Sequence, residues 1–155
     1  MAEATIKKAE KSDLRQILEL QYLAYQSEAR SHDDFSIPPL KQTLEEVEQE
    51  FAKGVFLKAI DENGVIVGSV RAYDDDNTAY IGKLIVQPKM QSQGIGTKLV
   101  AAIEQEYLDM RYELFTGYKS AKTIRLYEYL GYVKFKEQKV SDKLTLVFLE
   151  KRFSV

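Results

Sequence analysis

The stretch Gln91-Ser92-Gln93-Gly94-Ile95-Gly96-Thr97 joins a predicted strand to a predicted helix through two closely spaced glycines. The segment Tyr80 to Val86 is typical of a strand that Pro88 ends, and an apolar periodicity typical of a helix then runs to about Met110. The glycines allow a tight turn and a close approach of a ligand, because no Cβ stands in the way. The first amides of a helix lack intrahelical partners and lie at the positive end of its dipole. The turn therefore predicts an anion site that suits a phosphate-bearing cofactor.

The spacing of the glycines excludes two common phosphate-binding loops. A dinucleotide fingerprint, G-x-G-x-x-G, would need its third glycine at Leu99, and the interval from Gly94 to Gly96 is too short for a P-loop. What remains is Gln-x-x-Gly-x-Gly after a strand that ends in Leu84-Ile85-Val86. This pattern resembles the pyrophosphate loop of the GNAT superfamily of N-acetyltransferases, which bind acetyl-coenzyme A. The alternative is an ordinary strand-to-helix turn that uses glycine for its geometry.

Length and composition predict a single domain over residues 1–155, with 45% hydrophobic and 30% charged residues. The net charge of -2 gives no electrostatic case for a nucleic-acid partner. The absence of cysteine excludes a thiolate zinc site, and no His, Asp and Glu cluster has metal-ligand spacing, so we expect no metal. No apolar run reaches the length of a membrane span and no signal peptide is visible, so we expect a cytoplasmic protein without a membrane partner. The sequence leaves open whether the chain forms a homodimer.

Apolar residues recur at helical spacing in four segments. Ser12 is expected to cap the first of these helices. Thr43 and Glu46 form a capping box for the second, which Gly54 ends. The third follows the glycine turn, and the fourth covers residues 120–130.

Short apolar segments bounded by turn residues predict seven strands. They cover residues 5–8, 55–60, 65–73, 80–86, 113–116, 132–136 and 144–149. Asn63-Gly64 is a strong hairpin signal between the second and third strands. The polar segment Ser31 to Pro39 is expected to be a loop with His32 on its surface.

The order of elements, β-α-α-β-β-β-α-β-α-β-β, predicts an α/β fold of the mixed α+β kind. We expect a mostly antiparallel central sheet of about six to seven strands, flanked by about four helices. This order is similar to that of the GNAT fold, and the resemblance extends from Thr5 to Lys151. The resemblance implies that main-chain groups of Leu84, Ile85 and Val86 hold the pantetheine arm. It also implies that the backbone from Gln91 to Thr97 cradles the pyrophosphate; Ser92 stands where many members have glycine.

A second motif, Ser120-x-x-Thr123-Ile124-x-Leu126-Tyr127-x-x-Leu130-Gly131-Tyr132, resembles the family signature Asn-x-x-Ala-x-x-Leu-Tyr-x-x-x-Gly-Phe. Ser120 takes the place of the asparagine, and Thr123 that of the small residue. The resemblance implies that both lie near the cofactor and that the Tyr127 hydroxyl lies near the thioester sulfur. A phenol with a pKa of about 10 can protonate a departing thiolate with a pKa near 8.5. The alternative is that Tyr127 is a core aromatic.

Acyl transfer needs a neutral amine, and an amine with a pKa of about 10.4 is mostly charged near neutral pH. A carboxylate can accept its proton, so we name Glu28 as the candidate base. Tyr25 and Glu28 end the face of the first helix and are the predicted contacts of the acceptor amine.

We interpret the chain as an acyl-CoA-dependent N-acetyltransferase that transfers an acetyl group from acetyl-CoA to a primary amine by direct attack in a ternary complex. A main-chain amide of the Leu84 to Val86 strand would stabilise the oxyanion. The acceptor is a small-molecule or peptide amine whose identity no motif gives. Two alternatives remain open. One is a non-catalytic acyl-CoA sensor on the same fold, and the other is an interaction module in which the glycine turn is only structural.

Overall fold

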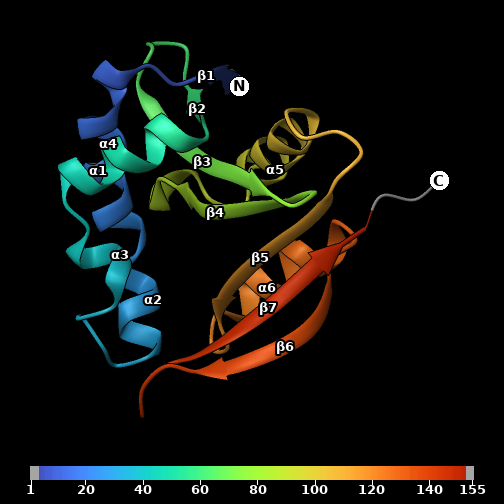
Figure 1. Cartoon of the computed structure of the whole chain (residues 1–155). Helices are drawn as coiled ribbons and strands as arrows, with labels where there is room; N and C mark the ends of the chain where they lie inside the picture. The colour runs from blue at the N-terminus through green and yellow to red at the C-terminus, as the bar shows by residue number, and fades with distance from the viewer. Residues whose placement is uncertain (1–3, 153–155) are drawn as a thin grey trace.

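The computed structural model describes residues 4–152, which form one sheet with helices on both faces (Figure 1). The strands are β1 (Thr5–Lys8), β2 (Val55–Ile60), β3 (Ile66–Asp75), β4 (Thr78–Val86), β5 (Arg111–Gly117), β6 (Val133–Lys139) and β7 (Thr145–Lys151). The helices are α1 (Leu14–Ala24), α2 (Gln26–Ser31), α3 (Pro38–Lys41), α4 (Leu44–Lys53), α5 (Ile95–Gln105) and α6 (Ala121–Tyr129). Two 3₁₀ turns, η1 (Lys11–Asp13) and η2 (Pro88–Met90), precede α1 and α5.

The sheet has seven strands in the order β1-β2-β3-β4-β5-β7-β6. Neighbouring strands are antiparallel except for β4 and β5, which are parallel. Parallel neighbours need a crossover connection, and α5 provides it here. The predicted mixed, mostly antiparallel sheet is confirmed.

Alternating side chains of β2 divide the core into two layers. Leu57 packs in a cluster with Leu99 and Ile103 of α5, whereas Phe56 packs in a cluster with Ile17 of α1 and with α4. Successive strand residues point to opposite faces, so α5 and the α1–α4 pair cover opposite faces of the sheet. The buried tyrosine of α6 belongs to the same cluster as α5.

The two halves of the sheet separate between β4 and β5. Their parallel register covers only residues 78–80 of β4 and 111–113 of β5. Beyond these residues the strands diverge, as Figure 1 shows, while β4 remains paired with β3 and β5 with β7. The divergence leaves the carboxyl half of β4 without a strand partner on the β5 side.

The start of α1 differs from the prediction that Ser12 caps it. The Glu10 amide donates to Asp13 Oδ2 at 2.7 Å, and the Lys58 ammonium of β2 lies 2.8 Å from the same oxygen. Asp13 therefore ties this end of the helix to the sheet, and no side-chain cap forms at Ser12. The Thr43–Glu46 capping box predicted for α4 is present.

The helix boundaries differ from the prediction in both directions. The predicted loop Ser31 to Pro39 overlaps the end of α2 and the start of α3, which leaves residues 32–37 irregular. The helix predicted to reach about Met110 ends at Gln105. None of the helices in residues 4–152 is long and apolar enough to cross a lipid bilayer.

Candidate functional site

The divergence of β4 from β5 leaves a cavity of about 370 Å³, which we call the inner cavity. Its walls include Tyr25 at the end of α1, Glu28 of α2, Phe115 of β5 and Tyr127 of α6. A cavity of about 350 Å³ at the start of α5, which we call the loop cavity, adjoins it. The two cavities share the residues Leu84, Val86, Gln91, Lys122 and Thr123.

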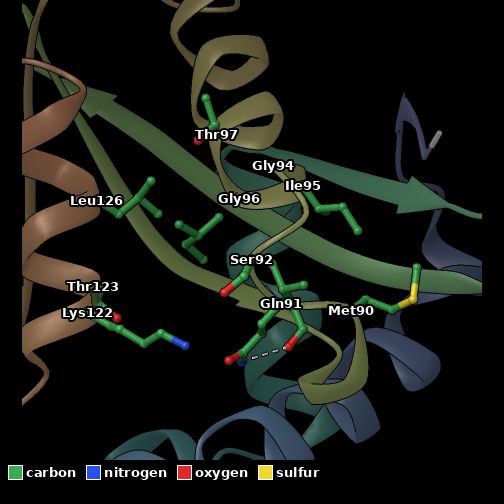
Figure 2. A pocket seen from close by; sticks show the side chains of 12 residues that line it. Met90, Gln91, Ser92, Gly94, Ile95, Gly96, Thr97, Lys122, Thr123 and Leu126 are labelled. Atoms are coloured by element: carbon green, nitrogen blue, oxygen red, sulfur yellow. Dashed lines mark hydrogen bonds between the residues drawn. The ribbon is translucent and has the colours of Figure 1, made fainter.

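Figure 2 shows the loop cavity between the glycine turn and α6. The side chains of Lys122 and Leu126 face the turn from the helix. The side-chain Nε2 of Gln91 donates to the Val86 carbonyl oxygen at 3.4 Å, which ties the turn back to the end of β4. The further lining residues are Leu84, Met90, Ser92, Gly94, Ile95, Gly96, Thr97 and Thr123.

Gly94 is the N-cap of α5 and adopts the left-handed conformation with φ of +85°. Ser92 has φ of +66°, so the loop departs from ordinary backbone geometry at two positions. No side chain caps α5, and the first amides of the helix are left for another acceptor. Gly96, in contrast to Gly94, does not adopt a positive φ. A Cβ there would lie 3.4 Å from Leu126 Cδ2, inside the loop cavity.

A β-bulge in β4 marks the point of divergence. Ser69 pairs with Ile85 and Arg71 with Gly82, so two residues of β4 stand opposite one of β3. Lys83, the first of the two, has φ of +50°, a conformation that costs free energy for a lysine. Such bulges bend a strand and redirect its side chains, and this one lies in the wall of the inner cavity.

The Glu28 carboxylate is held by the connection between β5 and α6. Its Oε1 accepts hydrogen bonds from Ser120 Oγ at 2.6 Å, the Gly117 amide at 3.2 Å and Thr116 Oγ1 at 3.3 Å. Three donors on one oxygen fix its position and leave Oε2 as the oxygen that can meet a ligand. Ser120 is the N-cap of α6, but its side chain makes no capping hydrogen bond.

His32 is buried, at 1% exposure, so the prediction that it is a surface residue is wrong. Its Nε2 accepts from the Lys119 amide at 3.3 Å, and its Nδ1 lies 3.0 Å from the Glu28 carbonyl oxygen. This pair of contacts requires the tautomer protonated at Nδ1. A Cβ on Gly117 would lie 2.4 Å from His32 Cε1, so the glycine permits the close approach of α2. The sequence did not indicate this burial, because the residues next to His32 in the chain are polar.

Tyr25 and Tyr127 both line the inner cavity. Burial, followed by the nearby charge of Glu28, raises the pKa of the Tyr127 phenol well above its usual value. The same two causes raise the pKa of Tyr25, with a further contribution from Tyr127. Both phenols therefore keep their protons through the neutral range. Within residues 4–152, the Tyr127 hydroxyl makes no hydrogen bond.

The fold brings most of the predicted site residues to the two cavities. Leu84 and Val86 line both cavities, whereas Ile85 lines only the inner one, where Ser120 also lies. Gln93 lines neither. Sequence reasoning missed Lys83, Phe115, Thr116, Lys119 and Lys122 of the inner cavity. Among the described residues, no group of three or more His, Asp or Glu side chains could hold a metal ion.

A family model described as the acetyltransferase (GNAT) family matches residues 12–132. No significantly similar sequence was found among curated proteins. A phosphinothricin acetyltransferase from Sinorhizobium meliloti, solved with AcCoA, has a TM-score of 0.76 at 20% identity, covering 96% of this chain and 88% of its own. The ribosomal-protein-S18-alanine N-acetyltransferase from Escherichia coli has a TM-score of 0.80 at 17% identity, with coverage of 98% and 95%. The PaiA N-acetyltransferase from Thermoplasma acidophilum, solved with coenzyme A, has a TM-score of 0.79 at 16% identity, with coverage of 97% and 99%.

Proposed function

The chain belongs to the acetyltransferase (GNAT) family, and we propose that it transfers an acetyl group from acetyl-CoA to a primary amine by direct attack in a ternary complex. The thioester of acetyl-CoA supplies the activated acyl group. The acceptor is a small-molecule or peptide amine that binds in the inner cavity, and acetyl-CoA reaches that cavity from the loop cavity.

The loop cavity suits the pyrophosphate of acetyl-CoA. The uncapped amides at the start of α5 and the positive end of its dipole favour an anion, and Gly94 supports the turn that presents them. Lys122 adds positive charge on the opposite wall. Leu84 and Val86 line both cavities, so the unpaired edge of β4 can hold the pantetheine arm through its main chain.

The inner cavity suits the chemistry of transfer. Glu28 presents one free carboxylate oxygen to an incoming ammonium and can accept its proton directly or through water. A main-chain amide of β4 would stabilise the oxyanion that forms as the amine attacks the thioester carbonyl. Tyr127 then donates its proton to the departing thiolate, and no covalent enzyme intermediate is needed.

One observation carries this proposal. The Tyr127 hydroxyl belongs to a buried phenol with a raised pKa, and it makes no hydrogen bond within the described residues although it lines the cavity between the separated strands. Among the described residues, Arg71 Nε is the one fully enclosed side-chain polar atom without a partner, so the unpaired Tyr127 hydroxyl is open to the cavity. A tyrosine needed only for packing does not have to meet a cavity, whereas an acid must face its substrate.

The test is release of free coenzyme A thiol from acetyl-CoA, measured over a panel of amino acids, polyamines, aminoglycosides and N-terminal peptides. We expect release with at least one class of amine. Calorimetry with coenzyme A separates the alternatives. Binding without thiol release from any amine would favour an acyl-CoA sensor, and absence of binding would leave an interaction module.

A further inference from the structure

Lys83 is a charged residue of the inner cavity for which the proposed mechanism has no use. It lines this cavity but not the loop cavity, so its position does not suit the pyrophosphate of acetyl-CoA. It lies in the bulge of β4 with a positive φ, a backbone conformation that is unfavourable for lysine. The other cations that line the cavity, namely Lys119, Lys122 and Arg125, are exposed, whereas Lys83 is partly buried.

The groups around Lys83 leave its charge without a direct counter-ion. Arg71 is 4% exposed, and its Nη1 lies 3.3 Å from Oε1 of Glu50. The other oxygen of Glu50 accepts from the side chain of Gln42. The Lys83 ammonium makes no ion pair or side-chain hydrogen bond with the described residues 4–152. Two cations therefore share one carboxylate, and that carboxylate is already bound to Arg71.

Burial lowers the pKa of Lys83; the charge of Glu50 opposes this effect and the charge of Arg71 adds to it. A buried ammonium is costly unless an anion or hydrogen bonds compensate for its lost solvation. Lys83 lines the inner cavity, whose only acidic lining residue among those described, Glu28, belongs to α2 and is held by the β5–α6 connection. The cavity therefore has an acidic group on one wall and, on another, a partly buried basic group without a direct counter-ion.

We propose that Lys83 forms a carboxylate subsite in the inner cavity, so that the acceptor is an amine that also carries a carboxylate, as an α-amino acid does. The amine lies toward Glu28 and Tyr127, and the carboxylate pairs with the Lys83 ammonium. This inference rests on the proposed acetyl transfer and narrows its acceptor class. It also gives a reason for the strained backbone at residue 83, because the bulge sets the lysine in the wall of the cavity.

The test compares a set of standard L-α-amino acids with the matching set of their carboxamides in the thiol-release assay. We expect kcat/KM to favour the free acids by roughly 10- to 100-fold, the worth of one hydrogen-bonded charge pair. Amidation lowers the pKa of the amine and increases its reactive neutral fraction, so a preference for the acids cannot come from amine ionisation. Lys83→Met should abolish the preference and Lys83→Arg should retain much of it. Lys53→Met, which removes an exposed charge on α4, should leave the preference unchanged.

Equal rates for acids and carboxamides in the parent would overturn the subsite, as would an unchanged preference in Lys83→Met. A second measurement does not depend on turnover: calorimetry of N-acetylglycine and N-acetylglycinamide in the presence of coenzyme A. If the acid binds more tightly than the amide and Lys83→Met removes this difference, the subsite is supported. This holds even if no amine is acetylated, because absence of acetylation would defeat only the proposed function. Equal binding of the two probes would defeat the subsite.

Discussion

Ser120 stands at the N-cap of α6, but its hydroxyl is committed to Glu28 at 2.6 Å. Serine at this position usually accepts a hydrogen bond from the first turn of its helix. Because that bond is absent here, Ser120→Ala should leave α6 stable and should instead loosen the Glu28 carboxylate. We expect a lower kcat/KM for the amine, with the coenzyme A dissociation constant unchanged and activity restored in Ser120→Thr.

A double-mutant cycle checks that the effect passes through Glu28. Glu28→Gln should itself lower the rate of transfer without weakening coenzyme A binding. In that background, Ser120→Ala should have little further effect. A full additional loss, or weaker coenzyme A binding in Ser120→Ala, would instead assign the hydroxyl to the cofactor arm, as the resemblance to the family signature implies.

Tyr127→Phe retains the ring and removes only the proposed acid. General acid catalysis is typically worth about 10²–10⁴-fold, so we expect kcat to fall by that order while coenzyme A affinity stays nearly the same. Tyr25→Phe is the matched control, because Tyr25 is a second phenol of the inner cavity with a raised pKa. Tyr25 is a predicted amine contact, so its loss should act mainly on the KM of the amine. A Tyr127→Phe enzyme that turns over within about threefold of the parent, where chemistry limits the rate, would contradict the acid role.

Individual residues show where sequence reasoning was limited. Tyr127 and Gly94 stand in recognisable motifs: the family resemblance implied a place for Tyr127 beside the cofactor, and the glycine spacing indicated a tight turn. Lys83 gives no such signal, because a positive φ on lysine is set by strand pairing and not by residue type. His32 was assigned to the surface because its neighbours are polar, but Gly117, far away in the sequence, makes room for it.

At the scale of elements, the turn into α5 depends on its two glycines in different ways. Gly94 has φ of +85°, and a Cβ built on it would meet no other atom within 4 Å. Gly94→Val should therefore strain the backbone of the turn without causing a steric clash. The turn should distort, and calorimetry should show coenzyme A binding weakened or lost. Gly96→Ala places a methyl in the loop cavity without requiring a positive φ. We therefore expect weaker coenzyme A binding with little loss of thermal stability; an unchanged affinity in both variants would remove the loop from the cofactor site.

The junction between α1 and β2 predicts a pH dependence of stability. Burial alone would raise the pKa of Asp13, but the hydrogen bond from Glu10 and the contact with Lys58 outweigh it and lower this pKa. A lowered folded-state pKa stabilises the protein above the unfolded-state value, about 3.9, and this contribution is lost as the pH falls through the folded-state pKa. Asp13→Asn should therefore lower the thermal midpoint near neutral pH. The difference from the parent should disappear at lower pH, and a constant difference across the range would contradict this account.

For the molecule as a whole, local patterns predicted the strands and the main helices well, because hairpin, capping and periodicity signals lie within a few residues. Capping by Thr43 and Glu46 is an example. The divergence of β4 from β5 could not be predicted from local sequence patterns. It depends on a pairing that ends at Tyr80 and Glu113, and on a bulge opposite β3, both of which are relations between distant segments. The site is a product of that divergence, so its motifs were predictable while its walls were not.

The central claim for the whole molecule is that the two adjoining cavities hold acetyl-CoA and the amine together. The most direct test is the initial rate of thiol release with both substrates varied, using the best amine of the panel. Direct transfer predicts double-reciprocal lines that intersect. Parallel lines would indicate an acetylated enzyme that forms before the amine binds, and they would contradict the account.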